Sequence, residues 1–411
     1  MDFPDDLSTG QRIRLIRESR GMTREVLAGM CGRGPDWLKK IENGDRHLRS
    51  HALILRVAAA LQLTDMSVLT GGARDGVTQP VHIGRLHHPA MPPIWDAVMG
   101  HRLAAPPAHP MDVPALQTRV DRTWHLWHST GQNRTAVLRL LPALIRDAEH
   151  AVRTSSGETR RAALVAQSDT YRLMGQATAY IAPPELAWVA ADRAMAAAQS
   201  ADEPAAIAAA AWNLGNILRE TSYADEAFQV VTDAASLIHP HLETGPDDWR
   251  GIYGALQLHA AVTLARDGRA GDAWRHWEAG DQVAKSLPAT YVHPSTVFGR
   301  ANVDFHEVSV AVDLRTARRA LSVADALDPD AMPSVERRAR LWVEVARGHL
   351  QRGDRTAALH VMQIAHRIGA ETVAYTPSAL STVTELWRSA PRALRPDAAR
   401  LAEAIGLQDA G

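Results

Sequence analysis

Basic side chains gather near the N-terminus, where their types and spacing suit contact with a polyanion. Residues 10–56 hold eleven Arg or Lys against five Asp or Glu, whereas the whole chain has a formal net charge of −1. Arginine and lysine bind phosphate groups, and both can donate hydrogen bonds to the edge of a guanine. A small basic region on a near-neutral chain therefore indicates binding to double-stranded DNA.

Short helices must position these side chains, and five are predicted over residues 7–70. Thr23 is a good N-cap for the second helix, and Pro35 stands at the first position of the third. Asn43-Gly44 ends the third helix, because glycine tolerates the left-handed backbone conformation. Two short helices joined by a tight turn can place the second of them in the major groove, where the base pairs differ.

Two stretches in this region follow a known order of residue types. They are Thr23-Arg24-Glu25-Val26-Leu27-Ala28 and, after Gly32 and Leu38, Ile41-Glu42-Asn43-Gly44. The order resembles the Xre/Cro-type helix-turn-helix of phage repressors, and the resemblance covers about residues 8–70. It implies a DNA-binding domain whose Arg17 and Glu42 form a partly buried salt bridge.

The resemblance also implies which residues contact DNA. Base edges would be read from the start and outer face of the third helix, where Lys40 is the best candidate for guanine. Asp36 would either accept from cytosine or stabilise the first helical turn, and both alternatives stay open. Trp37 is interpreted as a packing residue. The expected DNA-binding residues are Arg24, Arg33, Pro35, Asp36, Lys39, Lys40, Asn43, Arg46 and Arg49.

The rest of the chain is predicted to be helical and repetitive. Residues 71–114 hold many Pro and Gly, which indicates a linker, and residues 115–411 are rich in alanine. Small residues recur at intervals of 38 to 47 positions, as helix-pair repeats require. The alanines in register are Ala227, Ala273, Ala320 and Ala358. The fold is therefore expected to be all-α, with a stacked solenoid of about five helix pairs.

These repeats resemble the tetratricopeptide family over roughly residues 160–370. The resemblance implies a concave groove, and in regulators of this arrangement the repeat domain binds a signal peptide or forms a dimer. The groove positions carried over are Trp212, Asn216, Arg219, Asn302, Phe305, His306, Arg340 and Arg347. The alternative is that Trp212 and Phe305 pack between repeats and that the arginines are solvated.

Several classes of protein are excluded or disfavoured. Cys31 is the only cysteine, which rules out disulfide scaffolds and thiolate metal clusters. The acidic N-terminus lacks the pattern of a secretory signal, and no apolar run is long enough for a bilayer, so we expect a cytoplasmic, nucleoid-associated protein without membrane contact. The close histidine pairs lack zinc-motif spacing, so no metal, cofactor or catalytic residue is expected.

Three functions are compatible with the sequence. The first is a sequence-specific transcriptional regulator, expected as a homodimer, whose repeat domain takes a peptide or small-molecule effector. The second is a regulator whose repeats bind another protein and no effector. The third is a scaffold whose helix-turn-helix no longer binds DNA, which the local basic excess disfavours.

Overall fold

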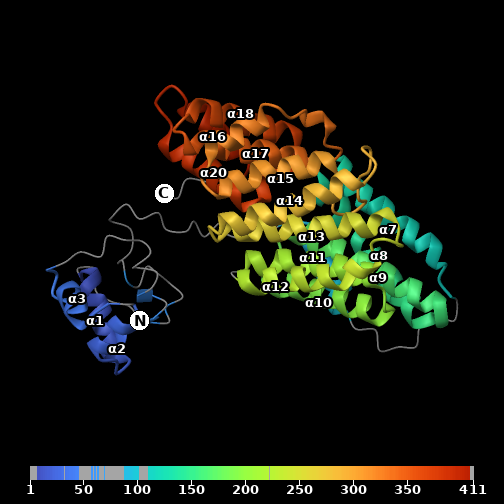
Figure 1. Ribbon diagram of the computed structural model, residues 1–411, viewed down its shortest axis with the longest axis horizontal. Coiled ribbons are helices and arrows are strands. Elements are labelled where there is room, and N and C mark those ends of the chain that lie inside the picture. The colour runs from blue at the N-terminus through green and yellow to red at the C-terminus, as the bar shows by residue number, and fades with distance from the viewer. Residues whose placement is uncertain are drawn as a thin grey trace. The chain divides into compact units, whose positions relative to one another are not determined.

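The structure is a computed structural model that describes residues 7–31, 33–45, 88–100, 110–221 and 223–407, and positions 57, 58, 60, 61, 63 and 69. The chain divides into two compact units, residues 1–84 and residues 85–411. Every regular element among the described residues is a helix (Figure 1). The predicted all-α fold is thus confirmed for this part of the chain.

The first unit contains three described helices in the predicted order. They are α1 (Thr9–Ser19), α2 (Arg24–Met30) and α3 (Pro35–Glu42). The hydroxyl of Thr23 accepts from the backbone N–H of Val26 at 3.3 Å, so Thr23 caps α2 as expected. Pro35 occupies the first turn of α3. The fourth and fifth predicted helices fall mostly outside the described residues.

One small apolar core holds these helices together. Helix α1 contacts α3 so closely that a Cβ on Gly10 would lie 2.0 Å from the carbonyl oxygen of Ile41. Only glycine fits at this crossing. The buried core side chains are Ile13, Ile16, Leu27, Ala28, Cys31, Leu38, Ile41, Val57, Ala58, Ala60, Leu61 and Leu69.

The second unit is built from helix pairs. In each pair the first helix packs against the second. The pairs are α7 (Val113–Ser129) with α8 (Asn133–Thr154), α9 (Gly157–Thr178) with α10 (Pro184–Ala201), α11 (Pro204–Glu220) with α12 (Ala224–Ile238), α13 (Asp247–Arg266) with α14 (Ala270–Ser286), α15 (Arg300–Asp313) with α16 (Ala317–Ala324), and α17 (Val335–Gln351) with α18 (Arg355–Ile368). Five of these pairs cover the region in which the repeats were predicted.

Shorter helices flank the pairs. They are α6 (Met91–Met99), α19 (Ala370–Tyr375), α20 (Pro377–Ser389) and α21 (Arg395–Ala404), with 3-10 turns at His239–His241 and Pro329–Ala331. Helix α6 lies in the segment predicted as a linker, and its Ile94, Ala97 and Val98 join the same core cluster as residues of α7 and α8. No helix in the described part of the chain is both long and apolar enough to cross a membrane.

The turns within the pairs explain the repeat pattern. All four alanines in register have no exposed surface, so they mark the close contact between the helices of a pair. Gly268 and Gly353 precede second helices with φ of 77° and 79°. Arg315 takes the equivalent turn with φ of 60°, which explains why this copy of the repeat is the weakest in sequence.

The six first helices, α7, α9, α11, α13, α15 and α17, form a closed series of contacts. Each contacts the next one along the chain, and α17 returns to contact α7. His128 at the end of α7 lies 3.0 Å from Ser334 Oγ at the start of α17 and 3.2 Å from the carbonyl oxygen of Ser295. The array therefore completes one turn of a superhelix and meets itself. The six first helices line the inside of this superhelical turn, and we call their side of the array the inner face.

Candidate DNA interface and inner polar cluster

Helix α3 presents one polar face and one apolar face. Leu38 and Ile41 are buried in the core, whereas the side chains of Asp36, Lys39 and Lys40 are exposed. Asn43, directly after the helix, is also exposed. Positions 36, 39, 40 and 43 have the spacing of a single helix face, so their donors and acceptors are free to meet base edges together.

Two further expected DNA-binding residues, together with Trp37, lie beside this face. Arg33 and Pro35 are exposed at the start of α3. Trp37 is half-buried and packs against the apolar core, in agreement with its interpretation as a packing residue. Arg46 and Arg49 lie outside the described residues, so their phosphate contacts stay a prediction.

Glu42 at the end of α3 fixes the geometry of this face. Arg17 of α1 donates to it twice, from Nε to Oε1 at 2.6 Å and from Nη2 to Oε2 at 3.1 Å. The salt bridge expected between Arg17 and Glu42 is thus present, and both residues are buried. The hydrogen bond that Arg17 donates to Glu42 is the main cause that raises the pKa of Arg17.

Arg24 of α2 also bonds to Glu42. Its Nε donates to Oε2 at 2.7 Å, while about a third of the side chain remains exposed. Glu42 therefore links all three described helices of the domain. A phosphate contact by Arg24, which stays a prediction, would have to use the terminal Nη groups, because the Nε is already engaged.

In the second unit, three of the expected groove residues are mainly packing residues. Trp212 is 8% exposed, Phe305 5% and Asn302 3%. Trp212 belongs to the apolar core between α11 and α13. Asn302 donates to the carbonyl oxygen of Thr296 at 3.3 Å. These side chains have little surface to offer a ligand, which favours the alternative reading of Trp212 and Phe305.

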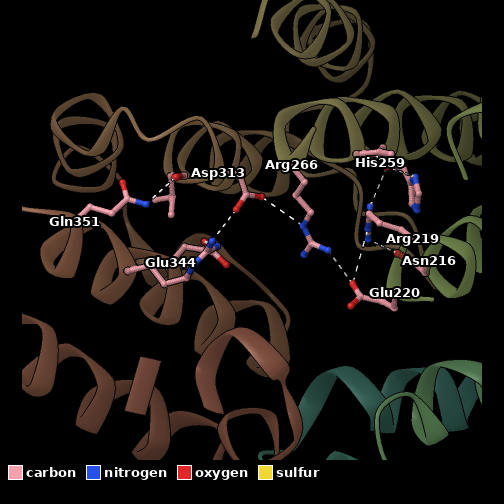
Figure 2. Close-up of polar contacts among 11 residues, drawn as sticks. Asn216, Arg219, Glu220, His259, Arg266, Asp313, Glu344 and Gln351 are labelled. Atoms are coloured by element: carbon pink, nitrogen blue, oxygen red, sulfur yellow. Dashed lines mark hydrogen bonds and ion pairs between the residues drawn. The ribbon is translucent and has the colours of Figure 1, made fainter. Parts of the chain in front are cut away.

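Two other expected residues start a row of ion pairs on the inner face. Arg219 of α11 donates to Asn216 Oδ1 at 2.7 Å, and its Nε lies 3.9 Å from Glu220. Arg266 of α13 lies between Glu220, at 2.9 Å, and Asp313 of α15, at 3.6 Å. Figure 2 shows Arg266 bridging these two carboxylates from neighbouring repeats.

The row continues into α17. Arg347 contacts Asp313 at 2.8 Å and also pairs with Glu344. About two turns earlier in the helix, Arg340 pairs with the buried carboxylate of Glu336. The other oxygen of this carboxylate lies 3.5 Å from Nε of Arg337. The row of ion pairs thus joins the C-terminal ends of α11, α13 and α15 to α17.

Tyr180, which follows α9, lies within electrostatic range of these charges. Burial raises its pKa, and the charges of Glu220, Arg340, Arg266 and Arg219 act on it from three helices. Its backbone is left-handed, with φ of 70°, a conformation that non-glycine residues rarely adopt. Strained residues of this kind often occur at binding sites.

Arg134, near the start of α8, is the most buried arginine in this region. It is 1% exposed and lies 5.4 Å from the ring centres of Trp127 and Tyr375. Burial, followed by the nearby Arg340, lowers its pKa to about 10. His306 is surrounded by Arg337, Arg219 and Arg340, and burial and these charges lower its pKa to about 3.

We call Arg134, Tyr180, Arg219, His306, Arg337 and Arg340 the inner polar cluster. Sequence reasoning found Arg219, His306 and Arg340 from repeat positions but missed the other three. Arg134 and Tyr180 lie near turns, where the helical period gives no signal. Arg337 lies on a first helix only one turn from a residue that was identified, so the repeat pattern could have revealed it. No group of three or more His, Cys, Asp or Glu in the described part of the chain is placed to hold a metal.

The comparisons with known proteins agree with the fold of the first unit. Residues 9–68 match the family model described as a helix-turn-helix domain. The curated proteins hold no match to the chain. Among solved structures, the chain is similar to the crystal structure of Bacillus thuringiensis PlcR in complex with the peptide PapR7 and DNA. The identity is 11% and the TM-score 0.27, over 90% of this chain and 98% of that chain.

Proposed function

We propose that the protein is a sequence-specific, DNA-binding transcriptional regulator associated with the nucleoid in the cytoplasm. The observation that carries this proposal is the exposed polar face of α3 within a helix-turn-helix domain. Asp36, Lys39, Lys40 and Asn43 occupy that face, while Leu38 and Ile41 anchor its opposite side in the core. The core thus holds the helix in place, and these four exposed side chains are available to contact base edges.

DNA recognition would use two kinds of contact, one to the bases and one to the phosphates. Lys40 would donate to guanine O6 and N7 in the major groove, which reports the identity of the base. Arg33, together with Arg24, Arg46 and Arg49, would neutralise phosphates, which sets position and affinity without reporting sequence. The hydrogen bonds of Arg17 and Arg24 to Glu42 would keep Arg24 in a fixed position relative to α3, which carries Lys40.

Recognition would require two copies of the domain. A single helix-turn-helix offers few base contacts, so specificity usually comes from a dimer whose half-sites are about 34 Å apart. The solution mass tests this part of the proposal. A dimer at micromolar concentration supports it, and a monomer that still binds an inverted repeat with one-to-one stoichiometry contradicts it.

The second unit would control the first by binding an effector. What supports an effector is the arginine-rich inner face, because charged donors concentrated on a concave helical array suit a ligand with carboxylate or phosphate groups. Assembly with another protein is the competing function. Capture of one protein in stoichiometric amounts by residues 85–411, with no small ligand bound, would favour that alternative.

Genome-wide occupancy of the full-length protein is the decisive experiment. A recurring motif with inverted symmetry supports a dimeric, sequence-specific regulator. The Lys40→Ala variant should give a motif that is relaxed at one base position while the protein remains folded, and Arg388→Ala, an exposed change on α20, serves as control. If no motif appears in any growth condition, and the purified protein binds no duplex at low salt, the proposal is wrong.

A further inference from the structure

Helix α8 carries a row of exposed positive charge along one side. Arg139, Arg146 and Arg153 are exposed and follow one another at intervals of seven residues. This spacing places them on the same side of the helix, over a length of about 21 Å. None of the three donates a hydrogen bond or forms an ion pair within the part of the chain that the structure describes. We call these residues the α8 arginine row.

The carboxylates of α8 do not neutralise the row, because other side chains engage them. Asp147 lies 2.7 Å from Arg119 of α7. Glu149 accepts from the hydroxyl of Tyr171 at 2.6 Å and lies 3.5 Å from Arg193. Both carboxylates are half-buried, so every exposed charged residue of α8 is an arginine.

The second helices of the next two repeats carry the opposite charge. The exposed charged residues of α10 are Glu185 and Asp192, and those of α12 are Asp225, Glu226 and Asp233. These acidic surfaces would repel a polyanion, whereas the α8 arginine row would attract one. Among these three helices, only α8 therefore suits contact with a polyanion.

The α8 arginine row lacks the apolar surroundings that other kinds of partner need. Within α8, all of which is described, Leu140 is the one large apolar side chain that is exposed. Protein interfaces usually bury an apolar centre, and helices that lie in a membrane surface insert an apolar face. Contact with the phosphates of a duplex requires neither, because charge attraction and counterion release drive it.

Helix α8 also lies close to the connection between the two units. Helix α6, the first described helix of the second unit, packs against α8, and its Ile94 shares a core cluster with Val137 of α8. Residues 70–87 join the units and span at most about 65 Å even when fully extended. A duplex bound by the first unit would thus remain within a limited distance of α8, which lets weak charge contacts contribute to affinity.

We propose that the α8 arginine row contacts the phosphate backbone of the duplex that the first unit binds. This inference rests on the proposed function, because it concerns the same duplex. Each guanidinium can hold a phosphate with two parallel hydrogen bonds. A duplex carries about one negative charge per 1.7 Å of its axis, so a row of this length meets several phosphates. The second unit adds affinity, and the choice of sequence stays with the first unit.

The test compares two triple variants of the full-length protein. The α8 variant combines Arg139→Gln, Arg146→Gln and Arg153→Gln. The control variant has the same net charge, and its three arginines are exposed, lack ion pairs in the described part of the chain and lie on three different helices, α16, α18 and α20. Its changes are Arg318→Gln, Arg367→Gln and Arg388→Gln.

Binding is measured over a salt series on two long duplexes, one of random sequence and one containing the site that the protein selects from a random library. The α8 variant should reduce the salt slope by about 2–3 units on both duplexes, because each lost phosphate contact lowers it by about 0.9. The ratio of the two affinities should stay unchanged. The control variant should bind like the unmodified protein.

Two results would overturn the inference. One is an unchanged salt slope in the α8 variant, and the other is an equal reduction in both variants. If the slope is unchanged but the α8 variant has a lower mass in solution, the row contacts the acidic helices of a second copy of this chain and not DNA. Circular dichroism checks folding, and if the triple variant is misfolded, the three single changes decide, each with an expected loss of about 0.9 units.

The selected site separates this inference from the proposed function. A preference for the selected site together with an unchanged slope in the α8 variant overturns the inference and leaves the regulator proposal standing. A reduced slope in the α8 variant without preference for any sequence supports the α8 contact and contradicts sequence-specific regulation. Failure of the unmodified protein to bind any duplex at low salt contradicts both.

Discussion

Glu42 holds Arg17 through two parallel hydrogen bonds of 2.6 and 3.1 Å, and both side chains are shielded from solvent. The residues lie 25 positions apart, so the pair ties α1 to α3. Because Arg24 of α2 bonds to the same carboxylate, the pair also sets the angle of the turn that gives the domain its name. In the proposed function, the interaction would hold the DNA-reading face of α3 in place without touching DNA itself.

Glu42→Ala should therefore destabilise the first unit. The change leaves the buried Arg17 without a charge partner, and breaking such a pair costs about 3 kcal/mol or more. Hydrogen exchange of the full-length protein should show faster exchange in α1, α2 and α3 and no change in α7 to α18. Glu25→Ala, an exposed change on α2, should cost less than about 0.5 kcal/mol. Equal effects of the two changes would contradict this account of Glu42.

Mutations of a base-reading residue and of a phosphate-binding residue should have different effects on DNA binding. Lys40→Ala should reduce binding to the preferred site by about 1–3 kcal/mol and relax the choice of base at one position. Arg49→Ala should weaken binding to every sequence and reduce the salt slope by about one unit. Selection from a random duplex library and a salt series measure the two effects. Identical behaviour of both variants on every sequence would refute the assignment.

Stability of the second unit should fall as the solution is acidified from pH 7 to pH 5. Burial lowers the pKa of His128 to about 4 and those of His293 and His306 to about 3. An unfolded chain protonates these residues below about pH 6.5, so it binds more protons than the folded chain, and stability is lost as pH falls. Each histidine contributes at most about 1.4 kcal/mol per pH unit.

Denaturant titrations at several pH values check this slope. His306→Gln should flatten it, and His360→Gln, an exposed change on α18, should not. The buried carboxylate of Glu336 does not explain a loss in this window. For Glu336, the attraction of Arg340 and Arg337 outweighs the effect of burial and lowers the pKa to about 2, so its contribution is lost only at more acidic pH. A stability that is flat between pH 7 and pH 5 would contradict buried neutral histidines.

The same substitution should have opposite effects at two arginines near α16. Arg315 has a left-handed backbone with φ of 60°, so Arg315→Gly should stabilise the protein by about 0.5–1 kcal/mol. Arg318 is exposed within α16, where Arg318→Gly should destabilise by about 1 kcal/mol. Thermal unfolding measures both. A loss of stability in Arg315→Gly would show that its side chain makes contacts worth more than the backbone strain.

Glu371 should stabilise the contact between α19 and the start of α8. Its carboxylate accepts from the backbone N–H of Arg134 at 2.7 Å and of Thr135 at 3.1 Å, which caps the start of α8 from α19. Glu371→Ala should cost about 1–2 kcal/mol and speed hydrogen exchange in α8 and α19. Glu385→Ala on α20 is the exposed control. Unchanged protection in α8 would mean that water replaces the cap fully.

The sequence predicted local features well, because they depend on near neighbours. The capping of α2 by Thr23, the proline start of α3 and the buried alanines of the repeats all follow from turn and packing preferences within a few residues. The pair of Arg17 and Glu42 came from family resemblance. The groove positions were less reliable, since Trp212 and Phe305 lie at repeat positions but are buried.

The contact between α7 and α17 was not predictable from the residues. His128 and Ser334 lie 206 positions apart, and their meeting depends on the small rotation that each repeat adds to the next. No single residue encodes that sum. The same reason hides Arg134 and Tyr180, whose surroundings depend on the return of α17 to α7.

The return of α17 to α7 also constrains how this protein can change in evolution. An open repeat array gains or loses a whole unit by duplication or deletion, because each unit contacts only its neighbours. Here an inserted helix pair would carry α17 past α7 and separate His128 from Ser334, and a deleted pair would stop short of the contact. Changes of length should therefore accumulate in the connections between helices, while the number of helix pairs stays constant among relatives that keep this contact.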